Sequence, residues 1–403
     1  MGSPVPVLNG LKVVEMTVWV AGPSAGGIMA DWGADVVKVE PPVGDPQRNL
    51  FKAIGYKEDM PNPAFALDNR GKRSVVLDLR SDEGKAAMEK LLEGADIFLS
   101  NMRPSALERL NLHPSQVHER FPKLIVATVS GYGLDGPEAG RPGYDIGAFW
   151  ARGGIARHLV PRDAAPVGVR AGLGDHVTGI STVSGILGAV FERGRTGKGR
   201  IVETSLLRAG AYTIGGDIGI QLQFGRIEST KARDKNPLAL VNCYEAGDGK
   251  WFWLIGLEAE RHFPGVLRAL GREELAEDER FKDAKSRKRH SEDLVAEFDR
   301  GFKTQPREYW AKRFDAEDVW WAPAQSLAEV VEDEQLHAAG GFIEIPAGEV
   351  EEKMTAVASP VTFRGDPLTH TGPIPALGEH TAEVLSEAGM SQEEIEKVAL
   401  EGN

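Results

Sequence analysis

One acidic residue stands where a helix is expected to begin. Gly174-Asp175-His176 directly precedes an apolar run with helical spacing, residues 177–192. The dipole of a helix keeps a carboxylate at its N-terminus ionised, and the first backbone N–H groups stabilise an oxyanion built there. Aspartate is equally a favoured N-cap residue, which would accept hydrogen bonds from those same N–H groups. The residues alone leave Asp175 open as a nucleophile or as a helix cap, and assign no role to His176.

Two glycine-rich segments resemble phosphate-binding motifs without completing them. GYGLDG, residues 131–136, has the spacing of a dinucleotide-binding turn, but PEAGRPG follows it in place of a helix, so it predicts a glycine-rich active-site loop. GRTGKG, residues 194–199, lacks the glycine spacing and the Ser or Thr of a P-loop and predicts a tight turn. No HExxH pair is present, and His113 and His118 are too far apart to share a helix face. No metal site is predicted.

Composition limits the class of protein further. The 403 residues carry 47 basic and 60 acidic side chains, a net charge of −13, which argues against a nucleic-acid partner held by general electrostatics. A single cysteine, Cys243, excludes an intrachain disulfide and fits a reducing compartment. No apolar run approaches the ~20 residues of a membrane span, and no secretory signal is evident. We expect a folded cytoplasmic protein without a membrane partner.

The order of the predicted elements indicates an α/β fold. Short β-branched runs at 11–17, 36–40, 74–79, 96–99 and 124–130 alternate with helical segments such as 23–32 and 82–93, which is typical of a mostly parallel sheet covered by helices. Composition changes at about residue 225, where charged and tryptophan-rich sequence begins. We therefore predict a large domain from residues 1–225 and 324–403 and a smaller α+β domain from residues 226–323, inserted between them.

Several ordered motifs resemble one family, the class III CoA-transferases, which includes formyl-CoA transferase and carnitine CoA-transferase. The motifs are LKVVEMTVWVAGPSAGGIMADWGADVVKVEPPVGDPQR (11–48), DNRGKRSVVLDL (68–79), ADIFLSNMRPSALERLNL (95–112), SGYGLDGP (130–137), RTGKGR (195–200) and LGEHTAEVL (377–385). The resemblance implies a Rossmann-like CoA-binding domain built from both chain ends and an interlocked homodimer. It also implies that CoA moves from an acyl-CoA to a free carboxylic acid, with the CoA thioester as co-substrate and no permanently bound cofactor.

The resemblance also places the functional residues. The family's nucleophilic aspartate, which forms a covalent aspartyl intermediate, falls on Asp175. N–H groups around Gly174 or in the glycine-rich loop would stabilise the oxyanion. Arginines among the CoA-contacting positions suit phosphate oxygens, whereas the apolar positions also fit an ordinary core. The CoA-contacting positions are Trp19, Val20, Leu77, Asp78, Leu79, Arg80, Asn101, Met102, Arg103, Arg109, Pro142, Gly143, Tyr144 and Asp145.

Departures from the family pattern bear on the reaction. Pro41 stands where formyl-CoA transferase has a basic residue, and residues 225–251 lack its glycine-run loop, which argues against formyl or oxalate specificity. The related α-methylacyl-CoA racemases place a histidine before an aspartate where this chain has Tyr144-Asp145. A phenol with a pKa near ~10 is a poor base, so transfer is favoured over α-proton exchange. A noncatalytic acyl-CoA-binding protein, with Asp175 as a cap, remains the third alternative.

Overall fold

The computed structural model describes residues 5–55, 62–346, 353–364 and 372–401. The chain divides into two compact units, each with its own core. The large unit comprises Met1–Arg157, Val167–Ile227 and Ala338–Asn403, and the small unit comprises His158–Pro166 and Glu228–His337. All fifteen of the predicted site residues belong to the large unit.

A six-stranded parallel sheet forms the centre of the large unit. Its strand order is β3-β2-β1-β4-β5-β6, which is the order of doubly wound nucleotide-binding folds. Val14 of β1 pairs with Val37 of β2 on one side and with Phe98 of β4 on the other. The predicted α/β class with a parallel sheet is confirmed. The strands are β1 (Lys12–Met16), β2 (Asp35–Glu40), β3 (Arg73–Val76), β4 (Ile97–Ser100), β5 (Ile125–Ser130) and β6 (Ile201–Ser205).

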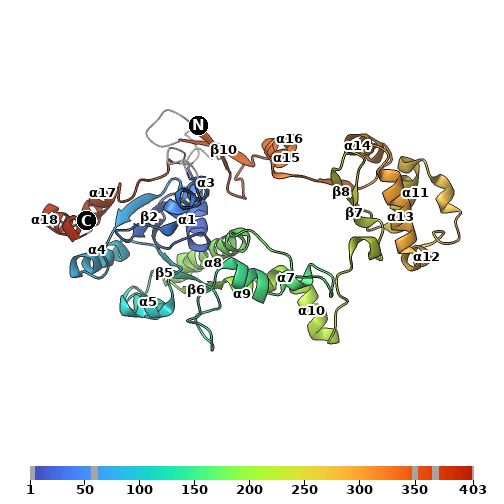
Figure 1. Ribbon diagram of the computed structural model, residues 1–403. Helices are drawn as coiled ribbons and strands as arrows, with labels where there is room; N and C mark the ends of the chain where they lie inside the picture. The colour runs from blue at the N-terminus through green and yellow to red at the C-terminus, as the bar shows by residue number, and fades with distance from the viewer. Residues whose placement is uncertain (1–4, 56–61, 347–352, 365–371, 402–403) are drawn as a thin grey trace. The chain divides into compact units, whose positions relative to one another are not determined.

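Helices cover both faces of this sheet. Because successive strand side chains point to opposite faces, Val13 packs in one buried cluster and Val14 in the other. The first cluster includes residues of α1, α8, α9 and a π-helix, and the second includes residues of α4, α5, α6, α17 and α18. Figure 1 shows α17 and α18 beside α4. These elements are α1 (Ala21–Asp31), α4 (Asp82–Glu93), α5 (Pro104–Arg109), α6 (Pro114–Arg120), the π-helix (Ile146–Arg152), α8 (Leu173–Thr196), α9 (Leu206–Thr213), α17 (Thr381–Glu387) and α18 (Gln392–Glu401).

Some boundaries differ from the sequence prediction. Helix α8 begins at Leu173, four residues before the expected apolar run, after Gly172 with a φ of 106°. It continues through Gly194 and ends before Gly197, where a φ of 69° reverses the chain. Hence Asp175 lies inside the first turn of α8. The C-terminal part of the large unit adds a separate two-stranded sheet, in which β10 (Phe342–Pro346) pairs antiparallel with β11 (Lys353–Val357).

The small unit packs helices on a three-stranded antiparallel sheet of order β7-β8-β9. Its core is rich in aromatic side chains, with the rings of Phe252 and Phe302 5.1 Å apart in an edge-to-face arrangement. Its elements are β7 (Val241–Glu245), β8 (Trp251–Ile255), β9 (Trp321–Ala324), α11 (Ala259–Leu270), α12 (Ala284–Arg289), α13 (Ser291–Phe302), α14 (Arg307–Ala316), α15 (Leu327–Val331) and α16 (Glu334–Ala338).

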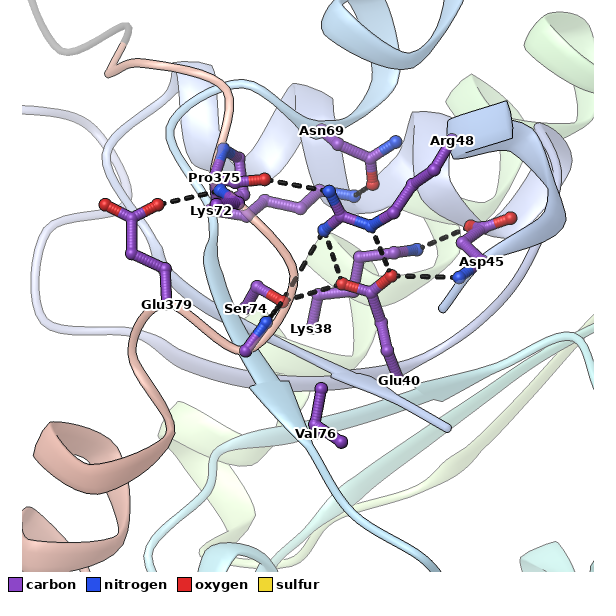
Figure 2. A network of polar contacts seen from close by, with 12 residues as sticks. Lys38, Glu40, Asp45, Arg48, Asn69, Lys72, Ser74, Val76, Pro375 and Glu379 are labelled. Carbon is purple, nitrogen blue, oxygen red and sulfur yellow. Dashed lines mark hydrogen bonds and ion pairs between the residues drawn. The ribbon is translucent and has the colours of Figure 1, made fainter. Parts of the chain in front are cut away.

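The C-terminal segment is fastened to the edge strand β3. Ser74 Oγ accepts a hydrogen bond from Gly378 N at 2.9 Å, and Arg48 donates to the carbonyl of Pro375 at 2.9 Å (Figure 2). Arg73 of β3 pairs with Glu383 and with Glu387 of α17. The last segment therefore completes the sheet edge. The remaining helices of the large unit are α2 (Leu50–Ala53), α3 (Pro63–Asn69), α7 (Ile155–His158) and α10 (Gly215–Phe224).

Within the ranges just described, no helix is both long and apolar enough to cross a bilayer.

Candidate active site

The candidate site lies where the strand order reverses, at the carboxyl ends of β1 and β4, which is the usual ligand position in such sheets. Asn101, after β4, clamps the loop after β1. Its Oδ1 accepts from Val18 N at 3.0 Å, and its Nδ2 donates to Val18 O at 2.7 Å. Two segments separated by about eighty residues are thereby joined at this edge.

Asp175 is buried in the first turn of α8, with 9% of its surface exposed. Its side chain does not cap the helix, and its carboxylate accepts no hydrogen bond from any residue in the described ranges. The carboxylate of Asp145 takes the capping position, accepting from Gly172 N at 2.8 Å and from Gly174 N at 3.3 Å. The interpretation of Asp175 as a helix cap is therefore wrong, because the helix starts earlier and another carboxylate caps it.

Close packing explains the glycine before Asp175. A Cβ on Gly174 would lie 2.5 Å from Cγ of Phe149, a fully buried side chain of the π-helix. One turn later, a Cβ on Gly179 would lie 2.0 Å from Oγ of Ser24 in α1. The two glycines let the start of α8 approach the π-helix and α1, which fixes the position of Asp175.

The surroundings of Asp175 disfavour its negative charge. Burial raises the pKa of its carboxyl to about 7, the charges of Asp145 and Asp68 add to the rise, and His176 opposes it. A carboxyl with such a pKa is about half ionised at pH 7. Buried titratable groups perturbed in this way are concentrated at functional sites.

His176 is hydrogen-bonded to a buried acid. Its Nε2 lies 3.1 Å from Oδ1 of Asp68, a buried residue of α3. Burial alone would lower the pKa of His176, but the hydrogen bond and charge of Asp68, together with the charge of Asp175, raise it. Burial raises the pKa of Asp68 in spite of His176. The pair places an ionisable imidazole next to Asp175 in the chain.

An apolar pocket of about 370 Å³ opens beside the loop after β1. Leu77 is fully buried, so it belongs to the core as well as to the pocket wall. The pocket brings together five of the positions at which the sequence predicted CoA contacts, with residues from the ends of β1 and β2. Its lining includes Thr17, Val18, Pro41, Pro42, Leu77, Asp78, Leu79, Arg80 and Met102.

The three predicted phosphate-binding arginines differ in their partners. Arg80 forms an ion pair with Asp78, with Nη2 2.7 Å from Oδ2. Arg103, the N-cap residue of α5, and Arg109, at the end of the same helix, are exposed. Neither guanidinium has a hydrogen bond or ion pair with any residue that the structure describes. Arg103 and Arg109 are thus available to an anion without breaking an internal pair.

The remaining predicted positions follow two loops. The ring of Trp19 meets that of Tyr144 edge-on, with centroids 6.0 Å apart. Val20 precedes α1, where its carbonyl accepts from Ser24 N at 2.8 Å. Gly143 packs closely on the glycine-rich loop, whereas Pro142 is exposed.

Sequence reasoning missed a buried charge network behind the loop after β1. Lys38 lies between Glu15 at 3.3 Å and Asp45 at 2.9 Å, and Lys72 lies 2.7 Å from the other oxygen of Glu15. Figure 2 shows Lys38, Asp45 and Lys72 in this network. Burial lowers the pKa of Lys72 to about 8. The signal was a charged residue inside each of two apolar strands, Glu15 in LKVVEMT and Lys38 in VVKVE.

A family model covers nearly the whole chain. The model of CoA-transferase family III matches residues 8–381. The chain belongs to this family. It is 32% identical to (R)-2-hydroxy-4-methylpentanoate CoA-transferase of Clostridioides difficile, over 96% of this chain and 97% of the relative. It is 31% identical to cinnamoyl-CoA:phenyllactate CoA-transferase of Clostridium sporogenes, over 97% and 96%.

Solved structures show the same fold. A CAIB/BAIF family protein from Brucella suis superposes with a TM-score of 0.84 at 30% identity, covering 95% of this chain and 99% of that one. The protein is therefore an enzyme of the family III CoA-transferase class, for which acyl-CoA is the co-substrate. In the ranges listed for the fold, no cluster of three or more His, Cys, Asp or Glu side chains has the arrangement of a metal site.

Proposed function

We propose that Asp175 is the nucleophile of a covalent transfer of CoA from an acyl-CoA to a free carboxylic acid. The observation that carries this proposal is a buried carboxylate without a hydrogen-bond donor at a helix N-terminus. Burying an unpaired charge opposes folding, so a purely structural role gives no reason to keep it. A nucleophile, by contrast, is more reactive when no donor occupies its oxygens.

The reaction proceeds by four exchanges at carbonyl carbons. A carboxylate oxygen of Asp175 attacks the thioester carbonyl, and the C–S bond breaks to give a mixed anhydride and CoA thiolate. The thiolate attacks the aspartyl carbonyl, releasing the first carboxylate and forming an aspartyl-CoA thioester. The incoming carboxylate attacks that thioester, and the released thiolate then attacks the new acyl carbonyl of the second anhydride. This last step gives the product thioester and frees Asp175, so the electron pairs balance and the thioester bond is conserved.

Free N–H groups in the first turn of α8 supply the oxyanion donors. Gly174 N is directed to Asp145, and Gly133 N is directed to Ser130 Oγ at 2.9 Å. The amides of Leu173 and Asp175 have no acceptor among the described residues. N–H groups at a helix start are unsatisfied within the helix, and each donor to an oxyanion contributes about 3 kcal/mol to transition-state stabilisation.

CoA binds along the carboxyl ends of β1, β3 and β4. The apolar pocket beside Leu77 and Met102 has room for a flat or branched portion of the cofactor. Arg103 and Arg109, free of internal partners, bind its phosphates, because a guanidinium matches phosphate oxygens in pairs. Binding this remote part holds the thioester against Asp175, and such positioning supplies effective molarities of roughly 10⁵ to 10⁸ M.

Trapping the aspartyl intermediate tests the nucleophile. The enzyme is incubated with an acyl-CoA and hydroxylamine and then examined by mass spectrometry. We expect a hydroxamate on Asp175 in the native enzyme and loss of CoA exchange in Asp175→Asn. The control variant Asp82→Asn, which changes an exposed acid on α4, should still form the hydroxamate on Asp175 and still exchange CoA. Exchange that persists in Asp175→Asn would refute the proposal. Deuterium uptake from D₂O into a 2-methylacyl-CoA, without an acceptor acid, would favour the racemase alternative, and binding without either reaction would favour a noncatalytic protein.

We further propose that the protein is a homodimer. Helix α10 has no buried residue, and the exposed fractions of Leu222 and Phe224 are 82% and 72%. Tyr212 in the preceding helix is 88% exposed. Apolar surface of this kind marks interfaces. Light scattering should give twice the chain mass for the native protein and a lower mass for Leu222→Asp; a native monomer would refute the dimer.

A further inference from the structure

Trp19 has a backbone conformation that a tryptophan rarely adopts. Its φ is 66°, in the left-handed region, and it lies three residues after the end of β1. Bulky residues are outliers there, and such strain persists only where the surroundings enforce it, which is most often at functional sites. The surroundings of Trp19 must therefore enforce this conformation.

Three successive residues of this loop are held by side chains from other segments. Lys38 Nζ donates to the carbonyl of Thr17 at 3.1 Å. Asn101 makes two hydrogen bonds to the backbone of Val18. Trp19 N donates to Oδ1 of Asp45 at 3.1 Å. The loop is thus fixed at every residue up to the strained one.

The carboxylate that holds Trp19 is itself fixed. Asp45 is fully buried; its Oδ1 also accepts from Gln47 N at 2.9 Å, and its Oδ2 lies 2.9 Å from Lys38 Nζ (Figure 2). Glu15 compensates Lys38 on the other side. Removing one member of a buried ion pair is costly because the other charge is left unpaired. The network therefore holds Trp19 rigidly in its strained conformation.

The ring of Trp19 packs against the loop that carries Asp145, the residue that caps the helix of Asp175. Trp19 meets the ring of Tyr144, which is 63% exposed. The next residue, Asp145, binds the N–H groups of Gly172 and Gly174 on either side of the start of α8. Tyr144, the exposed member of this aromatic pair, is thus adjacent in the chain to the carboxylate that caps the Asp175 helix.

The charges around Asp175 add a second constraint on the acid. Its pKa responds to two acids, Asp145 and Asp68, and to one base, His176. A second carboxylate on an acyl group bound there would meet mainly negative charge, whereas an uncharged side chain would meet aromatic surface.

We propose that Trp19 is a specificity-determining residue that, with Tyr144, contacts the side chain of the acid, and that Asp45 and Lys38 are positioning residues for its ring. The acid is then monocarboxylic with a branched apolar or aromatic side chain. This inference rests on the proposed transfer at Asp175. Aromatic rings bury large apolar area and pair with other rings, whereas two-carbon and dicarboxylic acids gain little from them.

Selectivity among CoA donors tests the inference. The kcat/KM values for 4-methylpentanoyl-CoA, 3-phenylpropanoyl-CoA, acetyl-CoA and succinyl-CoA are compared at a fixed acceptor. We expect the native enzyme to prefer the first two by at least about tenfold, in the range that a few methylenes give in an apolar site. Trp19→Gly, in which glycine keeps the positive φ, should lose about tenfold or more of that preference. Trp19→Phe should keep most of it.

Two further variants separate positioning from folding. Asp45→Asn keeps the shape of the side chain but removes its charge, and should reduce the preference without removing the ring. Tyr144→Ala changes an exposed residue and should reduce it in a folded protein, while Tyr309→Ala, an exposed tyrosine of the small unit, should not. Native preference for succinyl-CoA, or unchanged selectivity in both Trp19→Gly and Tyr144→Ala, would overturn the inference. If the specificity inference alone is wrong, hydroxylamine should still trap the intermediate at Asp175. If trapping fails but the variants change selectivity, only the assignment of Asp175 as the nucleophile is refuted.

Discussion

The ionisation of Asp175 should control the pH dependence of the enzyme. Burial, the largest cause, raises its pKa to about 7, and only the ionised carboxylate is a nucleophile. With that pKa the ionised fraction is about 90% at pH 8 and about 10% at pH 6. We expect kcat/KM to fall about ninefold over this interval. An aspartate at its ordinary pKa would show almost no change there.

Two substitutions should move this acidic limb in opposite directions. Asp145→Asn removes the nearby negative charge that raises the pKa of Asp175, so the limb should shift to lower pH by about one unit. Relative to an otherwise equal enzyme, the gain should be about fivefold at pH 6 and about ninefold at pH 5. His176→Gln removes the positive charge that lowers the same pKa, so the limb should shift to higher pH. The opposed signs distinguish electrostatic control from general damage to the site.

The assay follows CoA transfer between pH 5 and 9 at limiting acyl-CoA, because kcat/KM reports groups of the free enzyme. Each profile is normalised to its own plateau, so that loss of the Asp145 hydrogen bonds to Gly172 and Gly174 does not affect the comparison. A native limb near pH 4, or equal shifts in both variants, would refute the assignment of the limb to Asp175.

Three further predictions concern stability and binding. Folding raises the pKa of Asp175 from 3.8 to about 7, so its carboxyl favours the folded state at acidic pH and opposes it as the pH rises to 7. Asp175→Asn should therefore increase the free energy of unfolding by ~1–3 kcal/mol at pH 8 and by less at pH 5. Urea unfolding measures this difference, and equal gains at both pH values would contradict it. Arg109→Ala should raise the KM for acyl-CoA about tenfold, as loss of a charge-assisted hydrogen bond would, while Arg200→Ala, whose side chain pairs with Glu192, should leave it unchanged. Gly174→Ala should lower the free energy of unfolding by roughly 1–3 kcal/mol and lower kcat, because the new Cβ meets Phe149. Gly188→Ala, on the same helix, meets no atom and should be neutral or stabilising. Thermal unfolding of both variants tests this, and a neutral Gly174→Ala would contradict the packing.

The sequence predicted the fold best where the local residue pattern determines the secondary structure. The alternation of β-branched runs and helices predicted the parallel sheet, and α4 was predicted at its exact bounds. Family motifs identified the enzyme class. The start of α8 could not be predicted, because it depends on a capping carboxylate, Asp145, about thirty residues away in the chain. For the same reason the role of Asp175 as a cap could not be excluded from sequence.

The buried charges could not be placed from pattern alone either. Glu15 and Lys38 lie among apolar residues in two adjacent strands. Only the register of β1 with β2, where Glu15 pairs with Lys38, shows that they compensate each other. The partner of His176 was equally hidden, since Asp68 lies more than a hundred residues earlier. Long-range contacts of this kind follow from the packing of α1 between α3 and α8.

Fastening the last segment to β3 has a consequence for synthesis on the ribosome. The edge strand emerges near residue 76, but Gly378, which bonds to Ser74, and Glu383, which pairs with Arg73, emerge some three hundred residues later. Until then the border of the sheet is open to pairing with another nascent chain. Completion of translation, rather than formation of the first strands, therefore covers the β3 edge of the sheet.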